Sequence, residues 1–304
     1  MQTQFKIDDD TLIFASRELT AMRAKIYERQ YPEKKMASGQ ILPIEVMTEA
    51  AWADEIEIEE YDIYGIMQVI ADYSKGGPRV GNSTRRVRYQ IKTIGGHAGY
   101  SLEEINKARF ANKPLLAQRM RALREAYENY QDHVGYWGDP SFGLQGLFTL
   151  PLPTMISPIP FSGATSADDL LALLNSYVAA IQEPTFGLEA PKKMVLPEAQ
   201  YRRIFSTYRT NTSETIGEAF LRSQRAQNLI QDIIMDVKLK KAYNGQDVGL
   251  ILPDDEDKIS LGLTIPFTML PEQVQNMEFV THAYARVMGV VCKYPMSTLV
   301  FTNI

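Results

Sequence analysis

The pattern of hydrophobic and polar positions predicts a helix at the start of the chain. Apolar residues recur three or four apart from Leu12 to Ile26, after an acidic run at residues 8–10. This spacing predicts an amphipathic helix over residues 12–29 that ends near Pro32. We expect its apolar face to dock on another surface.

A long hairpin is predicted next. Residues 54–73 are rich in Ile, Val and Tyr and alternate strictly at 55–59, a second alternating run covers 86–91, and residues 74–78 have turn composition. At about 3.3 Å per residue, the extended arms reach roughly 50 Å. A compact chain of this length has a radius of gyration of only about 19 Å. The hairpin should therefore protrude, and because isolated two-stranded ribbons are marginally stable, we expect it to lie on a neighbouring copy.

The two arms of the hairpin carry opposite charges. Residues 54–62 contain six acids, and residues 75–92 contain six bases and no acid. These runs pair either within one hairpin or across a boundary between subunits. The candidate intersubunit contacts are Asp54, Glu55, Glu57, Glu59, Lys75, Arg79, Arg85, Arg86, Arg88 and Lys92.

Helices dominate the middle of the sequence. A capping box at residues 101–104 opens a helix that must break near Pro114, and the longest helix of the chain follows. Its apolar stripe runs from Leu116 to Val134 and predicts burial along a core. Proline-rich coil follows residues 138–140 and indicates a crossing into another subdomain.

The remaining chain mixes helices with strands, which predicts an α+β fold. Helices are expected at 166–181, at 198–205 and from Ser213 onward. Strands are expected at 193–196, 233–240, 249–252, 259–267, 278–291 and 298–301.

Composition narrows the function classes. The 304 residues are 45% hydrophobic and 23% charged, which is typical of globular proteins, and a net charge of −5 disfavours tight binding of nucleic acid. A single cysteine, Cys292, excludes an internal disulfide and any multi-cysteine zinc site. We find no apolar signal core and no run of about 18 apolar residues, so we expect neither export nor a membrane span.

No catalytic motif is complete. Residues 76–83 match a phosphate-binding loop except that Asn82 replaces the lysine, and a strand pattern follows where that loop needs a helix. His97, His133 and His282 have no metal-binding spacing, and the acidic run 254–257 lacks the glycine and terminal glutamate of a calcium loop. Cys292 lies in an apolar strand, where a buried thiol is expected. We therefore predict no enzyme activity, catalytic residue, cofactor or metal. A soluble hydrolase or a nucleotide-binding enzyme is the alternative of another class.

The order of elements resembles the major capsid proteins of tailed bacteriophages with the Hong Kong 97-type fold. That order is an arm, a long hairpin, a long helix, a mixed middle part and a strand-rich C-terminus. The segments that carry the resemblance are residues 14–20, 31–32, 99–105, 138–139 and 143–147.

The resemblance implies a division of the chain. Residues 1–50 would be the N-arm, 51–96 the extended loop and 97–140 the peripheral domain with its long spine helix. Residues 141–265 would form the axial domain, and 266–304 would return as C-terminal strands of the peripheral domain.

The resemblance also implies a function in assembly. Hexamers and pentamers would form an icosahedral shell around double-stranded DNA that is contacted only weakly and non-specifically. Partners would be a separate scaffolding protein, a portal and a decoration protein, with assembly in the host bacterial cytoplasm and a final place in the virion. Covalent cross-linking through Lys75 is not expected. An encapsulin-like nanocompartment, which shares the fold but encloses protein cargo, is the alternative.

Overall fold

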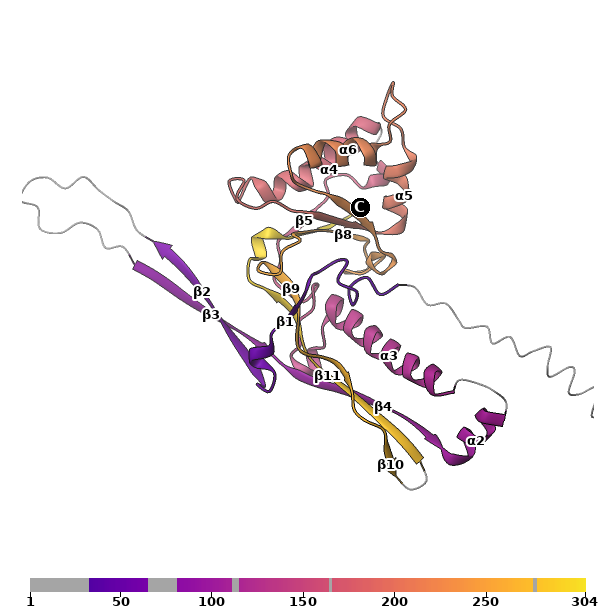
Figure 1. The fold of residues 1–304 in the computed structure, drawn as a ribbon. Helices are drawn as coiled ribbons and strands as arrows, with labels where there is room; N and C mark the ends of the chain where they lie inside the picture. The colour runs from indigo at the N-terminus through magenta and orange to yellow at the C-terminus, as the bar shows by residue number, and fades with distance from the viewer. Residues whose placement is uncertain (1–32, 65–80, 111–114, 164–165, 276–277) are drawn as a thin grey trace, which may run out of the picture. The chain divides into compact units, whose positions relative to one another are not determined.

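The structure, a computed structural model, describes residues 33–64, 81–110, 115–163, 166–275 and 278–304. The predicted arm helix and the turn at residues 74–78 lie outside these ranges. Within them the chain is α+β, as predicted, with two five-stranded sheets, a two-stranded ribbon and helices α2 to α6 (Figure 1). No described helix is both long and apolar enough to cross a membrane.

The first sheet is organised around β11. Strand order is β1–β9–β11–β10, and β4 pairs with β11 in antiparallel register. Helix α2 (Leu102–Phe110) follows β4, and α3 (Leu115–Trp137) lies along β4 and β11 (Figure 1). The strands are β1 (Ile44–Val46), β4 (Lys92–Ser101), β9 (Ile259–Met269), β10 (Gln273–Gln275) and β11 (Glu278–Cys292).

The second sheet has the order β5–β12–β8–β6–β7 and packs against three helices. In its core the rings of Tyr177 and Phe301 stack with centroids 4.2 Å apart, and burial raises the pKa of Tyr177 to about 12. The elements are β5 (Thr154–Ile156), α4 (Ala167–Gln182), β6 (Lys193–Leu196), α5 (Glu198–Ser206), α6 (Ile216–Ala226), β7 (Asp232–Met235), β8 (Val248–Leu252) and β12 (Leu299–Thr302).

Side-chain caps set the starts of three helices. At α2 the Ser101 hydroxyl accepts a hydrogen bond of 3.2 Å from the Glu104 N–H, as the sequence predicts. The Ser101 N–H and the Arg119 guanidinium both donate to the Glu104 carboxylate and lower its pKa. Helix α4 has the same box at Ser166. The prediction that a helix starts at Ser213 was wrong, because the box that caps α6 belongs to Thr215.

Two strand predictions also need correction. The predicted strand at 233–240 ends at Met235, because the Asp236 carboxylate accepts the Lys238 N–H at 3.0 Å and caps a short 3₁₀ turn. The sequence analysis ended its predicted strand at Ile91 and missed β4. Glycines at 95, 96 and 99 have low strand propensity, and pairing with β11 stabilises the strand.

Burial along α3 increases toward its C-terminal end. Val134 is buried with Leu144, whereas Leu123 and Tyr127 are half-buried and line an open groove of about 470 Å³ against β4 and β11. Tyr127 stacks on Phe267 across this groove with centroids 4.9 Å apart. The apolar stripe of α3 therefore lies in the core at its C-terminal end and lines the wall of the groove nearer its N-terminal end.

This gradient predicts unequal costs for equal truncations. Leu144→Ala should lower the free energy of unfolding by about 2–5 kcal/mol, because it leaves a cavity in a closed core. Leu123→Ala should cost less than half as much, because its side chain borders solvent. Urea unfolding of both variants measures the difference, and equal losses would contradict the burial gradient.

Glycines after α3 allow two backbone segments to meet. Gly138 has φ +70°, and a Cβ there would collide with the Leu144 carbonyl. Asp139 closes the same turn through backbone hydrogen bonds with Leu144 in both directions, at 2.9 and 3.0 Å. The sequence segments 138–139 and 143–147 thus encode close backbone packing.

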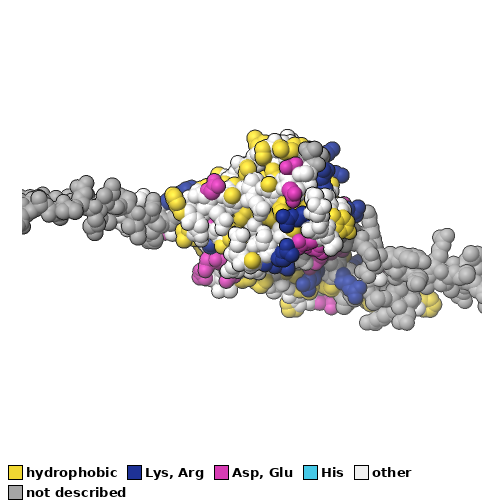
Figure 2. Space-filling view, turned by 90° about the horizontal axis from the view of Figure 1, so that it is seen from above, with side chains coloured by type: hydrophobic (Ala, Val, Ile, Leu, Met, Phe, Trp, Pro, Cys, Tyr) yellow, Lys and Arg dark blue, Asp and Glu magenta, His cyan; other side chains and the backbone are white. Residues whose placement is uncertain are grey.

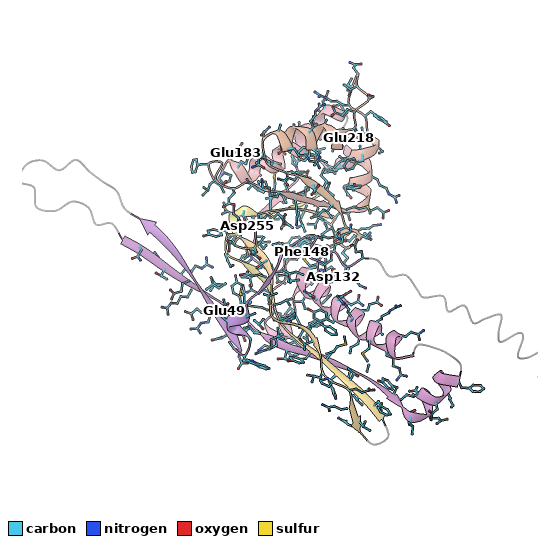
Figure 3. All side chains as sticks on the ribbon, in the orientation of Figure 1. Glu49, Asp132, Phe148, Glu183, Glu218 and Asp255 are labelled. Carbon is cyan, nitrogen blue, oxygen red and sulfur yellow. The ribbon has the colours of Figure 1, made fainter. Side chains whose placement is uncertain are left out.

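A buried polar network joins the C-terminal half of α3 to the chain after β7. Asp132, labelled in Figure 3, is 1% exposed, accepts the Met36 N–H at 3.0 Å and forms an ion pair with Lys238. The Tyr136 hydroxyl donates to Asp236, and burial together with the charge of Asp236 raises the pKa of Tyr136. The network therefore ties together three segments that are distant in sequence.

Candidate functional site: the charged ribbon

Strands β2 (Glu55–Tyr64) and β3 (Gly81–Gln90) form the predicted hairpin. They pair antiparallel from Glu55 opposite Gln90 to Tyr64 opposite Gly81 and join no other strand among the described residues. Ten paired positions extend for roughly 30 Å. In Figure 1 the ribbon runs away from both sheets.

One face of the ribbon is a ladder of opposite charges. Arg86 lies between Glu57 and Glu59, with Nε–Oε1 distances of 3.2 and 3.0 Å, and Arg88 Nε lies 3.0 Å from Glu57 Oε2. The Glu55 carboxylate accepts a hydrogen bond of 3.0 Å from the Gln90 amide. The alternative of pairing within one hairpin is therefore observed.

These ion pairs are exposed. The side chains of Arg86 and Arg88 are 64% and 63% exposed. Each such pair contributes about 0–1 kcal/mol because water screens it. The face stays accessible and highly charged, so it can engage a second surface.

The opposite face of the ribbon is apolar near its base. Ile56, Ile58 and Val87 are half-buried against a cluster that includes Met47 and Met288. Tyr89 is buried there, and its hydroxyl donates to the Cys292 carbonyl at 3.0 Å. The chain itself thus holds the base of the ribbon.

Arg286 fixes the turn that leads into the ribbon, and the sequence analysis missed it. The residue is 5% exposed and donates hydrogen bonds of 2.7 Å to the carbonyls of Ala51 and Ala53. Its guanidinium also lies 5.9 Å from the ring centroid of Trp52. An arginine directly before the apolar run at residues 287–292 is the sequence signal that could have indicated this role.

The other candidate contacts are divided between the ribbon and its surroundings. The exposed Asp54 carboxylate lies 3.6 Å from Arg286, Lys92 donates to the Gln90 amide oxygen at 3.3 Å, and Arg85 is exposed opposite Glu60. Lys75 and Arg79 lie outside the described residues. The intersubunit role of all ten residues stays a prediction.

Large apolar side chains are exposed away from the ribbon as well. Phe186 is 98% exposed and Leu188 81% exposed in the loop after α4, and Ile156 of β5 is 74% exposed. On the face in Figure 2, apolar side chains lie among both acidic and basic ones. Each of these side chains is accessible to a second surface.

The described residues contain no group of three or more side chains suited to holding a metal ion. Cys292 is buried, as predicted. In the acidic run, the Asp255 carboxylate accepts the Asp257 N–H at 3.0 Å within a turn. The near match to a phosphate-binding loop continues at Gly81 as strand β3, without the helix that would hold an anion.

Comparison with known families identifies the chain. A family model described as "Major capsid protein" matches residues 65–304, more than three quarters of the sequence. The chain belongs to the major capsid protein family. No curated protein sequence matches it.

Solved capsids have the same fold as this major capsid protein. The capsid of Myoviridae phage XM1 is similar with a TM-score of 0.80 at 15% identity, covering 99% of this chain and 100% of that one. The capsid of an empty GTA particle matches with a TM-score of 0.65 at 8% identity and coverages of 92% and 94%. These likenesses confirm the Hong Kong 97-type fold that the order of elements predicts.

Proposed function

We propose that this major capsid protein assembles into hexamers and pentamers that close an icosahedral shell around double-stranded DNA. The ribbon carries the proposal, because its two strands pair only with each other among the described residues and present a charged face at positions 55–59 and 86–90. A repeated contact on a neighbouring copy would stabilise it. The exposed Phe186 and Leu188 support a second contact between copies.

The proposed roles follow the predicted division of the chain, with two refinements. Because β4 pairs with β11 from Lys92 onward, we end the extended loop at Ile91. Because β12 pairs with β5 and β8, we group it with the axial domain. Scaffolding protein, portal and decoration protein are proposed partners, host cytoplasm is the proposed place of assembly, and the role is structural rather than catalytic.

Electron microscopy and sedimentation of the purified chain test this function. Closed shells, or rings with five-fold and six-fold symmetry, are the expected result. A chain that stays monomeric or dimeric at high concentration would overturn the proposal.

An encapsulin-like shell is the second candidate. A virus-like particle from Pyrococcus furiosus matches with a TM-score of 0.51 at 12% identity, covering 86% of this chain and 90% of that one. This likeness is weaker than that to the XM1 capsid, which favours a phage shell. Portal and tail genes beside the coding gene would support the phage proposal, whereas a cargo-enzyme gene there would support the nanocompartment.

A charge swap separates contacts between copies from pairing within the ribbon. The variant Glu57→Arg, Glu59→Arg, Arg86→Glu, Arg88→Glu keeps the net charge and inverts the ladder pairs among these four residues. We expect the assembly threshold, the protein concentration at which shells form, to rise about tenfold. A loss of about 1.4 kcal/mol in the attraction between subunits corresponds to this factor.

The control is salt. Since the Debye length falls from about 10 Å at 0.1 M to about 3 Å at 1 M, the difference between swapped and original chains should shrink at high salt. Sedimentation of shells against free subunits measures the threshold. Equal thresholds at low salt would show that the ladder serves only its own hairpin.

A further inference from the structure

Two of the three histidines face each other across a strand pair. His97 of β4 lies directly opposite His282 of β11, and their ring centroids are 5.8 Å apart. Among the described residues, neither imidazole has a hydrogen-bond partner. In each neutral ring one nitrogen is thus available to bind a ligand.

The two rings stand on an open face of the sheet. A Cβ at Gly96 would lie 3.0 Å from the Leu123 side chain, so α3 covers the Gly96 face, and His97 points to the other one. The same-face neighbours of His97 on β4 are Gly95 and Gly99, which have no side chains to crowd the ring. His97 is exposed and His282 half-buried, beside a shallow hollow of about 380 Å³.

The spacing of the rings suits a shared metal ion. With a metal–nitrogen distance of about 2.0–2.1 Å, the ion lies roughly 3.2 Å from each ring centre. When the nitrogen–metal–nitrogen angle is tetrahedral, the centres of two imidazoles on one ion are about 5 Å apart. As this angle widens, the separation grows to at most about 6.4 Å. The observed 5.8 Å lies within this range.

We propose that His97 and His282 together bind one divalent transition-metal ion between β4 and β11. Imidazole nitrogen favours Zn²⁺, Cu²⁺ and Ni²⁺ over Mg²⁺, which prefers oxygen. No lysine or arginine lines the hollow. The Glu278 carboxylate lies on the same face, where a side chain at Gly99 would collide with it, and its negative charge favours a cation. The other coordination positions stay open to water.

Binding would hold the outer strand of the sheet in place. Strand β4 pairs with β11 along one edge and with no other described strand, and it continues directly from the ribbon. An ion that bridges the pair stabilises the folded chain, because the two imidazoles are brought together only by that pairing.

Metal titration of the purified full-length chain tests the site. We expect calorimetry to show one Zn²⁺ bound per chain, and about 1 mM Zn²⁺ to raise the unfolding temperature by several degrees. His97→Gln and His282→Gln should each abolish both effects. Their unfolding temperatures without metal show whether the variants fold.

His133→Gln is the matched control, because His133 is exposed on α3, away from the strand pair. It should keep the full response to Zn²⁺, and Mg²⁺ should give none with any chain. An undiminished response in His97→Gln or His282→Gln, a lost response in His133→Gln, or no Zn²⁺ binding by the original chain would each overturn the proposal.

Discussion

A chain without residues 61–84 will fold but will not form closed shells. The cut removes the outer part of the ribbon and keeps Ile56, Ile58, Val87 and Tyr89, which pack against the body of the chain. A short Asn-Gly turn can join Glu60 to Arg85 because these residues are already paired in register. Since the removed strands pair only with each other among the described residues, the folded core should lose little.

Circular dichroism and thermal unfolding check the fold of this variant, and electron microscopy checks assembly. We expect an unfolding temperature within a few degrees of the original and no shells. A shorter cut of residues 65–80 keeps every described pair and serves as the matched comparison. Normal shells from the longer cut would show that the outer part of the ribbon, residues 61–84, is not needed for assembly.

Gly289→Ala should produce a large loss of stability from a single added methyl group. Gly289 has φ +83° within β11, and a Cβ there would collide with the Gln145 carbonyl. That carbonyl accepts the Val290 N–H at 2.8 Å, so the strand and the loop cannot separate without losing the bond. Left-handed strain of about 1–2 kcal/mol and overpacking of about 1–3 kcal/mol add to roughly 2–5 kcal/mol.

Gly245→Ala separates these two costs. Gly245 has φ +76°, and no atom lies within 4 Å of its added Cβ, so only the backbone strain remains. Urea unfolding of the unassembled subunit should show a loss of about 1–2 kcal/mol for this control. Equal losses in both variants would mean that close packing between Gln145 and Gly289 is unimportant.

Local patterns in the sequence predicted most of the elements. The capping residues Ser101 and Ser166 placed the starts of α2 and α4, and alternation at residues 55–59 placed β2. These signals are reliable because the interactions that produce them join residues only a few positions apart. The order of elements was also sufficient to predict the fold family.

Other features depended on partners far away in the chain. Strand β4 contains three glycines and is a strand because β11 pairs with it along its whole length. The Asp236 carboxylate, which caps the turn after β7, is held in place by the hydroxyl of Tyr136, a hundred positions earlier. No local pattern contains such information, because tertiary contacts override weak propensities.

The charged ribbon shows where the sequence by itself was sufficient and where the tertiary structure was needed. Composition alone determined that one arm is acidic and the other basic, since that count needs no geometry. Only the strand register decided that Arg86 lies between Glu57 and Glu59, that Arg286 holds the base of the ribbon, and that His97 faces His282. In the ribbon, a shift of one strand by one residue would move its charged side chains to the opposite face, and packing of Tyr89 against the core favours the register observed.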